Sequence, residues 1–368
     1  MKIAVLSSHT PSLFWFRLDM MQSFIDKGHK VYALGNEAES DWADKFGENG
    51  IVYRQIYVQR NGTNPVKDLK SITSIKSVLA EIMPDKIFTY QAKTIIYGTI
   101  AANKLGITEV YPLIAGLGSL FLNDDAKTKA LRKIMLLEYK YSMRKCPLVF
   151  FQNTDDLNTF KSAGVINKQK TLILHGSGVS LEKFTVQPMP EQFAFLCISR
   201  LIRDKGVYEY LKACEIVKKN NPNVRFLLVG PFDTNPSALK KNELQVFIDN
   251  GTIEYFGEQA DVVPYYKQAS VYVLPSYREG TPKTVLEAMA CGRAVITTDV
   301  PGCRETVDDN VNGLLVPAKD VEKLALAMQF MIDNPDEVCR MAANGRNKAE
   351  EVFDVNKINA SICDAMKL

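Results

Sequence analysis

The sequence has little of what marks several common protein classes. Among its 368 residues no stretch approaches 18 uncharged apolar positions, so no membrane span is indicated. Its seven cysteines include no Cys-x-x-Cys pair, which favours reduced cytosolic thiols over a disulfide framework. Only three histidines occur, which argues against a histidine-rich metal site. With 46% hydrophobic and 24% charged residues, the composition is that of an ordinary soluble globular protein.

Three short motifs are also absent. No Gly-x-Gly-x-x-Gly follows the first predicted strand, whose loop reads Ser7-Ser-His-Thr-Pro-Ser-Leu13, so a dinucleotide-dependent dehydrogenase is a weak alternative. No Asp-x-Asp pair occurs, a pairing often used to hold a metal–diphosphate. The N-terminus, Met1-Lys-Ile-Ala-Val-Leu6, enters a strand directly and lacks the layout of a signal peptide.

Charge is present but unevenly distributed. Residues 1–184 carry 24 Lys+Arg and 17 Asp+Glu, a balance of +7, while the remainder carries 21 and 25, a balance of −4. We therefore expect the first half to meet an anionic partner. The densest cations interleave with apolar residues over 124–145 and predict one basic amphipathic helix. Such a helix would suit a membrane surface, or equally a core-facing helix with a solvated basic face.

Strand-length apolar runs alternate with helical patterns throughout, which predicts an α/β fold with parallel sheets. The length exceeds what one core usually serves, so two domains are expected. We predict an N-terminal domain over 1–184, a proline-containing linker over 185–191 and a C-terminal domain over 192–352. A final helix within 353–368 would pack back on the first domain. The simplest assembly is two Rossmann-like domains whose parallel sheets face a cleft.

The individual elements can be predicted by range. Strands are expected at Lys2–Leu6, His29–Leu34, Ile51–Val58, Lys86–Thr89, Glu109–Ile114, Leu148–Phe151, Thr171–Leu174, Phe193–Ser199, Val224–Gly230, Thr252–Phe256, Val271–Ser276, Ala294–Thr298 and Gly313–Pro317. Helices are expected at Phe14–Lys27, Val207–Asn220, Val321–Phe353 with a break at Asn334-Pro335, and Val355–Met366.

The most informative stretch runs from Arg278 to Ala288. Two carboxylates, Glu279 and Glu287, bracket a turn and the start of a predicted helix that follows a buried strand. Glu279 would therefore lie at the carboxyl end of that strand, where open α/β sheets bind ligands, and could accept hydrogen bonds from hydroxyls. The helix N-terminus favours anions, and Glu287 could reach a ribose diol. Taken alone, a pair at this spacing is more often a loop charge and a solvated helix position.

A second feature follows the strand predicted at Phe193–Ser199. There Arg200-Leu-Ile-Arg203-Asp204-Lys205-Gly206 stands immediately before a helix, so Arg200 and Lys205 suit a diphosphate. A solvated charged turn is the alternative. The carboxylate-bracketed loop several strands later favours the functional interpretation.

Together these motifs resemble family 4 of the glycosyltransferases, and they arrive in the family's order. The matching segments are Ser199-Arg200-Leu201 with Lys205-Gly206, Phe226–Gly230, Tyr255–Gly257 with Asp261-Val262, Leu274–Ser276, Glu279-Gly280 with Glu287-Ala288, Gly292–Ile296 and Gly313–Val316. The match is dense over 193–317. It is thinner in the first half, where Gly116-Leu-Gly118 and similar segments resemble bacterial members that build surface polysaccharides, such as O-antigen or capsule, on lipid diphosphates.

The resemblance implies the B-type glycosyltransferase fold, with a donor role for the second domain and an acceptor role for the first. It implies that Arg200 and Lys205 hold the donor diphosphate and that Glu279 orients the sugar hydroxyls. Transfer would retain the anomeric configuration and need no obligatory metal or cofactor. The further donor contacts that it implies are Gly230 and Pro231 lining the cleft, Glu258 and Val262 edging the base, Gly280, Thr281 and Pro282 closing on the sugar, and Glu287 on the ribose.

The acceptor side is less well defined. His9 could touch the acceptor or the diphosphate, or could instead cap a backbone group; Arg17 could face an acceptor phosphate, and Lys93 could face the acceptor or be an exposed lysine. Gly118 belongs to the Gly-x-Gly of this domain. Many family members carry a histidine just before that motif, whereas this chain has Ala115.

The resemblance therefore predicts a cytoplasmic enzyme, peripherally associated with the inner face of the cytoplasmic membrane through its basic N-terminal domain. It would move a hexosyl or N-acetylhexosaminyl unit from a UDP-sugar to a glycan acceptor linked to undecaprenyl diphosphate, without nucleic acid. A nucleotide-sugar epimerase on the same scaffold and a degenerate, non-catalytic binding subunit are the alternatives. Motif spacing does not determine the sugar, the linkage, the choice of UDP over GDP, the acceptor or the oligomeric state.

Overall fold

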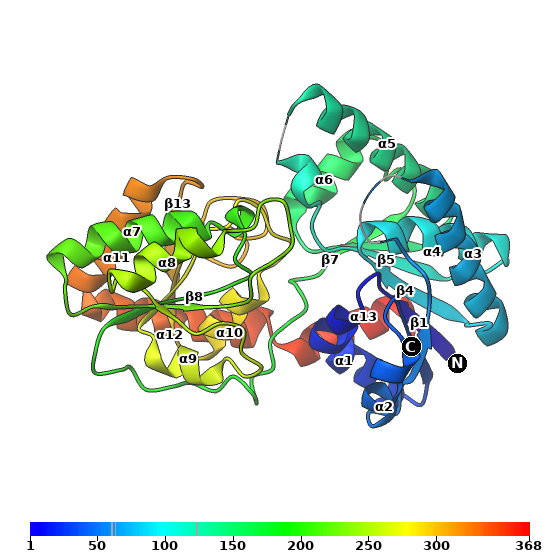
Figure 1. Ribbon diagram of the computed structural model, residues 1–368. Helices are drawn as coiled ribbons and strands as arrows, with labels where there is room; N and C mark the ends of the chain where they lie inside the picture. The colour runs from blue at the N-terminus through cyan, green and yellow to red at the C-terminus, as the bar shows by residue number, and fades with distance from the viewer. Residues whose placement is uncertain (60–61, 63, 123) are drawn as a thin grey trace. The chain divides into compact units, whose positions relative to one another are not determined.

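The structure is a computed structural model that describes residues 1–59, 62, 64–122 and 124–368. The chain divides into two compact units (Figure 1): Met1–Ser177 with Val355–Leu368, and Gly178–Asp354. The first unit thus ends before the expected boundary at 184, because Val179 and Phe184 pack into a core cluster of the second unit. The segment expected to be a linker also belongs to the second unit, where the buried Arg293 donates to the Pro188 carbonyl at 2.7 Å.

The described residues of the first unit contain a parallel sheet of seven strands, in the order β3-β2-β1-β4-β5-β6-β7. Its strands are β1 (Lys2–Leu6), β2 (Lys30–Gly35), β3 (Val52–Gln55), β4 (Lys86–Tyr90), β5 (Val110–Ile114), β6 (Leu148–Phe151) and β7 (Lys170–Ile173). Its helices are α1 (Thr10–Asp26), α2 (Glu39–Gly47), α3 (Pro65–Ile82), α4 (Ala92–Lys104), α5 (Ala126–Met143), α6 (Thr154–Ser162) and α13 (Val355–Met366), with a short 3-10 turn at Ser119–Phe121.

Five strands of this sheet contribute to two cores, because alternate side chains point to opposite faces; these are β1, β2, β4, β5 and β6. In β1, Ile3 and Val5 enter the core beneath α1, α2 and α13, whereas Ala4 and Leu6 enter the core beneath α3 to α6 (Figure 1). Burial on both faces explains why the strands read as continuous apolar runs in the sequence.

The described residues of the second unit contain a parallel sheet of six strands, in the order β10-β9-β8-β11-β12-β13. Its strands are β8 (Ala194–Ile198), β9 (Arg225–Val229), β10 (Glu254–Tyr255), β11 (Val271–Leu274), β12 (Ala294–Thr298) and β13 (Gly313–Val316). Its helices are α7 (Val207–Asn220), α8 (Lys241–Asp249), α9 (Val263–Gln268), α10 (Lys283–Ala290), α11 (Val321–Asp333) and α12 (Pro335–Val352), with a 3-10 turn, η2, at Arg203–Lys205. Helices α7, α8 and α11 share one core with the sheet, while α9 and α10 share the other (Figure 1).

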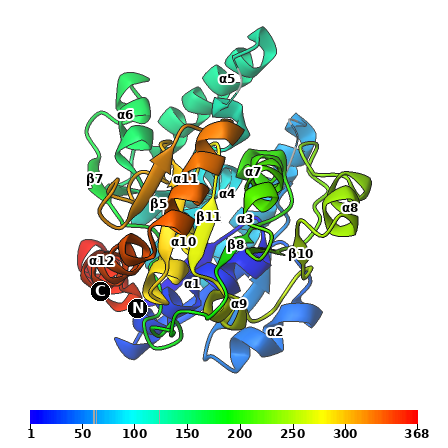
Figure 2. The same ribbon diagram turned by 90° about the vertical axis from the view of Figure 1, so that its left-hand side faces the viewer.

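Strand order reverses once in each sheet. In the first, β2 and β3 lie on one side of β1 and β4 on the other. In the second, β9 and β10 lie on one side of β8 and β11 on the other; Figure 2 shows β8 between β10 and β11. Loops that leave two such neighbouring strands in opposite directions open a crevice at their carboxyl ends, which is where ligands bind in open α/β sheets. The topology therefore marks the loops after β1 and β4, and those after β8 and β11.

Most predicted elements lie within a few residues of their observed bounds, and the largest difference is at the start of the first helix. Helix α1 begins at Thr10 rather than at Phe14. Pro11 lies in its first turn, where the fixed φ of proline fits a helix and an N–H would have no partner within the helix. The basic helix begins at Ala126, where the Asp125 side chain accepts from the Thr128 amide. Within the described ranges no helix is both long and apolar enough to cross a membrane.

Candidate functional site

The reversal point of the second sheet brings two charged residues together that stand 74 positions apart in the sequence. Lys205 lies in the turn η2 that follows β8, and Glu279 lies in the loop that follows β11. The Lys205 Nζ is 2.5 Å from the Glu279 Oε1. The Ser276 hydroxyl donates to the same oxygen at 2.7 Å. Three loop residues at the carboxyl ends of β8 and β11 thus form one polar cluster.

This ion pair is largely shielded from water. The side chain of Glu279 is 12% exposed and that of Lys205 is 23% exposed. The Glu279 amide donates to the Pro301 carbonyl at 3.0 Å, which fixes the backbone of its loop. A cation held in such surroundings stabilises negative charge more strongly than one in bulk water. The cluster can therefore supply a positive charge for a diphosphate and carboxylate oxygens for sugar hydroxyls.

Two glycines allow the loops around this cluster to touch through their backbones. Gly230, at the end of β9, has φ 142°, and a Cβ there would lie 1.8 Å from the Ser199 carbonyl oxygen. Gly302, after β12, has φ 85°, and a Cβ there would lie 2.4 Å from the Glu279 carbonyl oxygen. Because neither position admits a side chain, the loops after four adjacent strands approach one another closely through their backbones.

Arg200 stands at the carboxyl end of β8, as predicted, but its partner is on the neighbouring loop. It is half-exposed, and its NH1 lies 2.8 Å from the Asp233 Oδ2. Burial raises the pKa of Asp233, but hydrogen bonds from the Asn235 amide and from Arg200 outweigh this and leave it lowered. Pro231, also predicted at the site, accepts at its carbonyl from the Leu201 amide at 3.0 Å. For Arg200 to hold a diphosphate, it would have to exchange Asp233 for the ligand.

Glu287 is buried in the body of α10, with 8% of its surface exposed. The Tyr266 hydroxyl donates to its Oε2 at 3.0 Å and to the Thr284 carbonyl at 2.9 Å. Burial raises the pKa of Glu287, while Lys283 and Tyr266 act in the opposite direction. A ribose contact by Glu287 stays a prediction.

The remaining predicted donor residues lie on loops beside these groups. Pro282 is the extended residue that precedes α10, so Gly280 and Thr281 stand directly before the N-terminus of that helix. Glu258 is exposed, and Val262 precedes α9 and packs on the core beneath it. Their contacts to sugar and base stay predictions.

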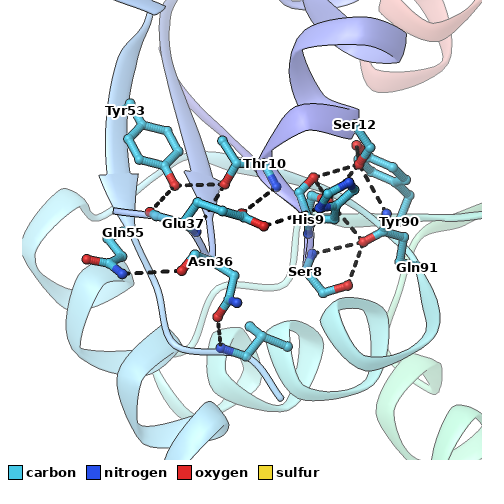
Figure 3. A network of polar contacts seen from close by, with 12 residues as sticks. Ser8, His9, Thr10, Ser12, Asn36, Glu37, Tyr53, Gln55, Tyr90 and Gln91 are labelled. Carbon is cyan, nitrogen blue, oxygen red and sulfur yellow. Dashed lines mark hydrogen bonds and ion pairs between the residues drawn. The ribbon is translucent and has the colours of Figure 1, made fainter. Parts of the chain in front are cut away.

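The reversal point of the first sheet holds a network of neutral groups (Figure 3). The Gln91 side chain, after β4, accepts at its Oε1 from the Ser8 amide at 2.9 Å and from the hydroxyls of Ser7 and Ser8 at 3.0 and 2.6 Å. Gln91 adopts φ 71°, a left-handed conformation that is strained for a residue with a side chain. The loops after β1 and β4 are thus joined by one side chain.

His9 lies at the edge of this network, in the residue before α1. Its Nδ1 is 3.2 Å from the Glu37 Oε1, and the Thr10 amide donates to the Glu37 Oε2 at 2.7 Å (Figure 3). Burial raises the pKa of Glu37, but hydrogen bonds from His9 and Thr10 outweigh this and lower it to about 2. The imidazole therefore pairs with a carboxylate rather than capping a backbone group.

The other predicted acceptor residues are more dispersed. Arg17 is 3% exposed, and its guanidinium stacks over the ring of Tyr90 at 4.8 Å. Tyr90 in turn shares a 2.8 Å hydrogen bond with Ser12 of the network, so Arg17 touches it indirectly. Lys93 pairs with Asp68 of α3 at 2.7 Å, and Gly118 is exposed with φ 69°. The roles of His9, Arg17, Lys93 and Gly118 toward an acceptor stay predictions.

Several residues of both clusters were not predicted as site residues. Three of them stand just past the carboxyl end of a strand: Ser276, Gln91 and Glu37. A polar residue at that position is the sequence signal that could have identified them as site residues. Tyr266 had no such signal, because its partner Glu287 lies on another helix.

Comparison with known proteins shows similarity to glycosyltransferases over both units. A family model described as glycosyl transferases group 1 matches residues 192–334, and one described as glycosyl transferase 4-like matches residues 2–153. The Campylobacter jejuni N,N'-diacetylbacillosaminyl-diphospho-undecaprenol alpha-1,3-N-acetylgalactosaminyltransferase is 26% identical, over 97% of this chain and 96% of that protein. The Escherichia coli UDP-Gal:alpha-D-GlcNAc-diphosphoundecaprenol alpha-1,3-galactosyltransferase is 27% identical, over 79% of this chain and 77% of that protein.

Solved structures show the same fold. The crystal structure of Anabaena HepE in complex with UDP and glucose has a TM-score of 0.81 at 19% identity, covering 100% of this chain and 99% of that one. The sucrose-phosphate synthase of Thermosynechococcus elongatus has a TM-score of 0.81 at 19% identity, covering 100% and 98%. Both units are Rossmann-like, and the fold is that of the B-type glycosyltransferases. The chain therefore belongs to family 4 of the glycosyltransferases, and it resembles the bacterial enzymes that extend lipid-diphosphate-linked glycans.

Proposed function

We propose that this glycosyltransferase moves a hexosyl or N-acetylhexosaminyl unit from a UDP-sugar to a saccharide carried on undecaprenyl diphosphate, with retention at the anomeric carbon. The observation that carries the proposal is the shielded Lys205–Glu279 pair at the reversal point of the second sheet. The two relatives support the acceptor class, since both enzymes are named for an acceptor linked to undecaprenol through a diphosphate. The Escherichia coli enzyme is also named for UDP-Gal, a UDP-sugar.

The proposed chemistry uses the charges of the second unit. Transfer breaks the bond between the anomeric carbon and a diphosphate oxygen and forms a bond from that carbon to an acceptor hydroxyl oxygen. Negative charge grows on the leaving UDP, which takes up the proton of that hydroxyl. Lys205 stabilises that charge, and Arg200 joins it once it leaves Asp233. Glu279 holds the sugar hydroxyls, and Glu287 holds the ribose. No protein nucleophile is assigned, and the cations supply the stabilisation for which other enzymes use a metal, so no obligatory cofactor is proposed.

The acceptor belongs to the first unit in this proposal. His9, the Ser7–Ser8–Gln91 network and Lys93 offer polar groups for a saccharide, and Arg17 lies one contact behind them. Because the acceptor is anchored in lipid, the enzyme would work at the cytoplasmic face of the membrane and associate with it peripherally through the basic first unit.

A metal-free thermal-shift panel of UDP, GDP, ADP, NAD and UDP-sugars tests the donor proposal first. We expect a saturable rise in Tm with UDP and with one or more UDP-sugars, and none with NAD. The best donor is then incubated with a lipid-diphosphate saccharide, with and without EDTA, and the new linkage is assigned by NMR. Inversion at the anomeric carbon, loss of transfer in EDTA, or conversion of the donor sugar without acceptor would each contradict one element of the proposal. The last outcome would favour an epimerase.

A further inference from the structure

A groove of about 510 Å³ opens on the first unit, away from the reversal point of its sheet. One wall is the C-terminal part of α5, and the other is the turn between α6 and β7. The lining residues are Leu137, Lys140, Tyr141, Arg144, Val165, Asn167, Lys168 and Gln169.

The walls of this groove are held together by one amide side chain. Gln169 donates from its Nε2 to the Met143 carbonyl, at the end of α5, at 3.1 Å. Its Oε1 accepts from the amides of Asn167 and Lys168 at 3.0 and 3.1 Å. The helix and the turn are therefore fixed to each other, so the groove is a built feature of the unit.

The chemistry of the lining favours an anion. Lys140, Arg144 and Lys168 are exposed cations, and none of the eight described lining residues is acidic. Arg144 also stacks on the ring of Tyr141 at 4.6 Å, which holds its guanidinium at the rim. The partial negative charge of the C-terminus of α5 opposes an anion, but it is about half a charge against three full ones. A phosphate group, which Arg and Lys bind well, fits this set.

The exposed face of α5 next to the groove carries large apolar residues. Ile134, Leu137 and Tyr141 are 54%, 58% and 57% exposed, and their spacing places them on one side of the helix. The exposed cations Lys127, Lys129 and Lys133 extend the basic surface along α5. In this helix, which lies wholly within the described range 124–368, the one exposed acid is Glu138. Apolar side chains among cations are the pattern of a helix that lies on an anionic bilayer.

We propose that this groove seats the phosphate of an anionic phospholipid headgroup, while Leu137 and Tyr141 enter the boundary between headgroups and acyl chains. The inference rests on the membrane association within the proposed function and is independent of the donor chemistry. It assigns the groove a binding contribution beyond the general attraction of a basic helix.

Two variants with equal charge loss separate those contributions. The groove variant is K140Q/R144Q/K168Q, and its matched control is K127Q/K129Q/K133Q from the other half of α5. Partitioning of the full chain is measured by sedimentation with phosphatidylcholine vesicles that do or do not contain phosphatidylglycerol. Each cation near an anionic surface contributes on the order of fivefold to binding. We expect the groove variant to lose at least about tenfold more binding than the control, and only with phosphatidylglycerol.

Equal losses in the two variants would overturn the proposal, because they would show diffuse attraction alone. A third variant, L137S/Y141S, keeps all charges and is expected to weaken binding to the anionic vesicles; unchanged binding would remove the insertion part. Inorganic phosphate is tested without vesicles. A Tm rise in the wild type that the groove variant lacks, together with equal vesicle binding by both, would assign the groove to a free anion and overturn the proposal.

The donor response to UDP is the control for folding. It should be the same in the wild type and all three variants, since none of the changed residues lies in the second unit. Failure of the UDP response in the wild type would count against the proposed function and leave the vesicle result to be judged by itself.

Discussion

The reversal points of the two sheets have the same topology but different chemistry. In the second sheet a cation and a carboxylate meet directly, in the Lys205–Glu279 pair. In the first sheet a neutral amide, Gln91, joins the two loops, and the contact of the His9 imidazole with Glu37 stands at the edge. The same topological position therefore carries charged side chains in the second unit and mainly hydroxyl and amide groups in the first. The contrast fits a diphosphate-bearing donor in the second unit and a saccharide in the first.

The strongest way to break this contrast is to remove the charge of Glu279. The Glu279→Gln substitution keeps the shape of the side chain but leaves Lys205 unpaired and weakens hydroxyl binding. We expect kcat/KM for the donor to fall by about 100-fold or more, a scale typical of preorganised polar groups, with the far-UV circular dichroism unchanged. Near-normal kcat/KM would remove Glu279 from the site. Glu337→Gln, at an exposed ion pair on α12, is the matched control and should be silent.

The equivalent change in the first unit is Gln91→Ala, and it should act on stability and on the acceptor. Three donors lose their shared acceptor, which costs about 1–3 kcal/mol in the free energy of unfolding when such groups stay buried. KM for the acceptor should rise while the Tm shift with UDP is preserved. Gln91→Gly separates the two effects of the side chain, because glycine tolerates φ 71° and should recover part of the stability. An altered UDP response in either variant would refute the assignment of separate roles.

Tyr277 offers a smaller perturbation of the charged reversal point. Its hydroxyl donates at 2.7 Å to Glu209, which is buried on α7, and its amide donates to the Asp204 carbonyl at 2.9 Å. These bonds tie the loop of Glu279 to the turn of Lys205. Tyr277→Phe should lower donor kcat/KM by about tenfold, with a loss of about 1 kcal/mol in stability. Glu209→Gln keeps an acceptor for the Tyr277 hydroxyl and should therefore lower donor kcat/KM less than Tyr277→Phe does. Equal losses would show that the Tyr277–Glu209 hydrogen bond does not position Glu279.

The smallest expected effect concerns acid stability at the edge of the neutral network. The pKa of Glu37 falls from 4.5 to about 2 in the folded state, so the ionised form stabilises folding above pH 4.5. That contribution is lost as pH falls from 4.5 through 2. Because the group is about one-third exposed, it is on the order of 1 kcal/mol after solvent screening. The free energy of unfolding, measured with urea, should change less with pH over this window in Glu37→Gln than in the wild type. Parallel curves would show that Glu37 is not held ionised by His9 and Thr10.

Local pattern predicted much of the fold. The predicted bounds match the structure for helices α7 and α13 and strands β6 and β12. Each of these helices buries one face and each of these strands buries both, so their apolar residues follow a regular pattern. The predicted start of α1 was wrong by four residues, because Pro11 and Ser12 are typical of a loop, whereas the helix begins at Thr10. For the second site, the residue types at the strand ends were informative because a parallel strand must deliver its loop to the same edge as its neighbours.

The order of strands and helices, and the charged residues that follow β8 and β11, could be read from local pattern along the chain. The pairing of β11 with β8 could not, since strand neighbours depend on the packing of whole cores and not on local spacing. That pairing brings Lys205 within 2.5 Å of Glu279 and leaves Arg200 to Asp233. The tertiary structure likewise decided that Gln91, unremarkable in the sequence, joins the two loops of the first sheet, because hydrogen bonds form between groups that the fold places together, whatever their separation along the chain.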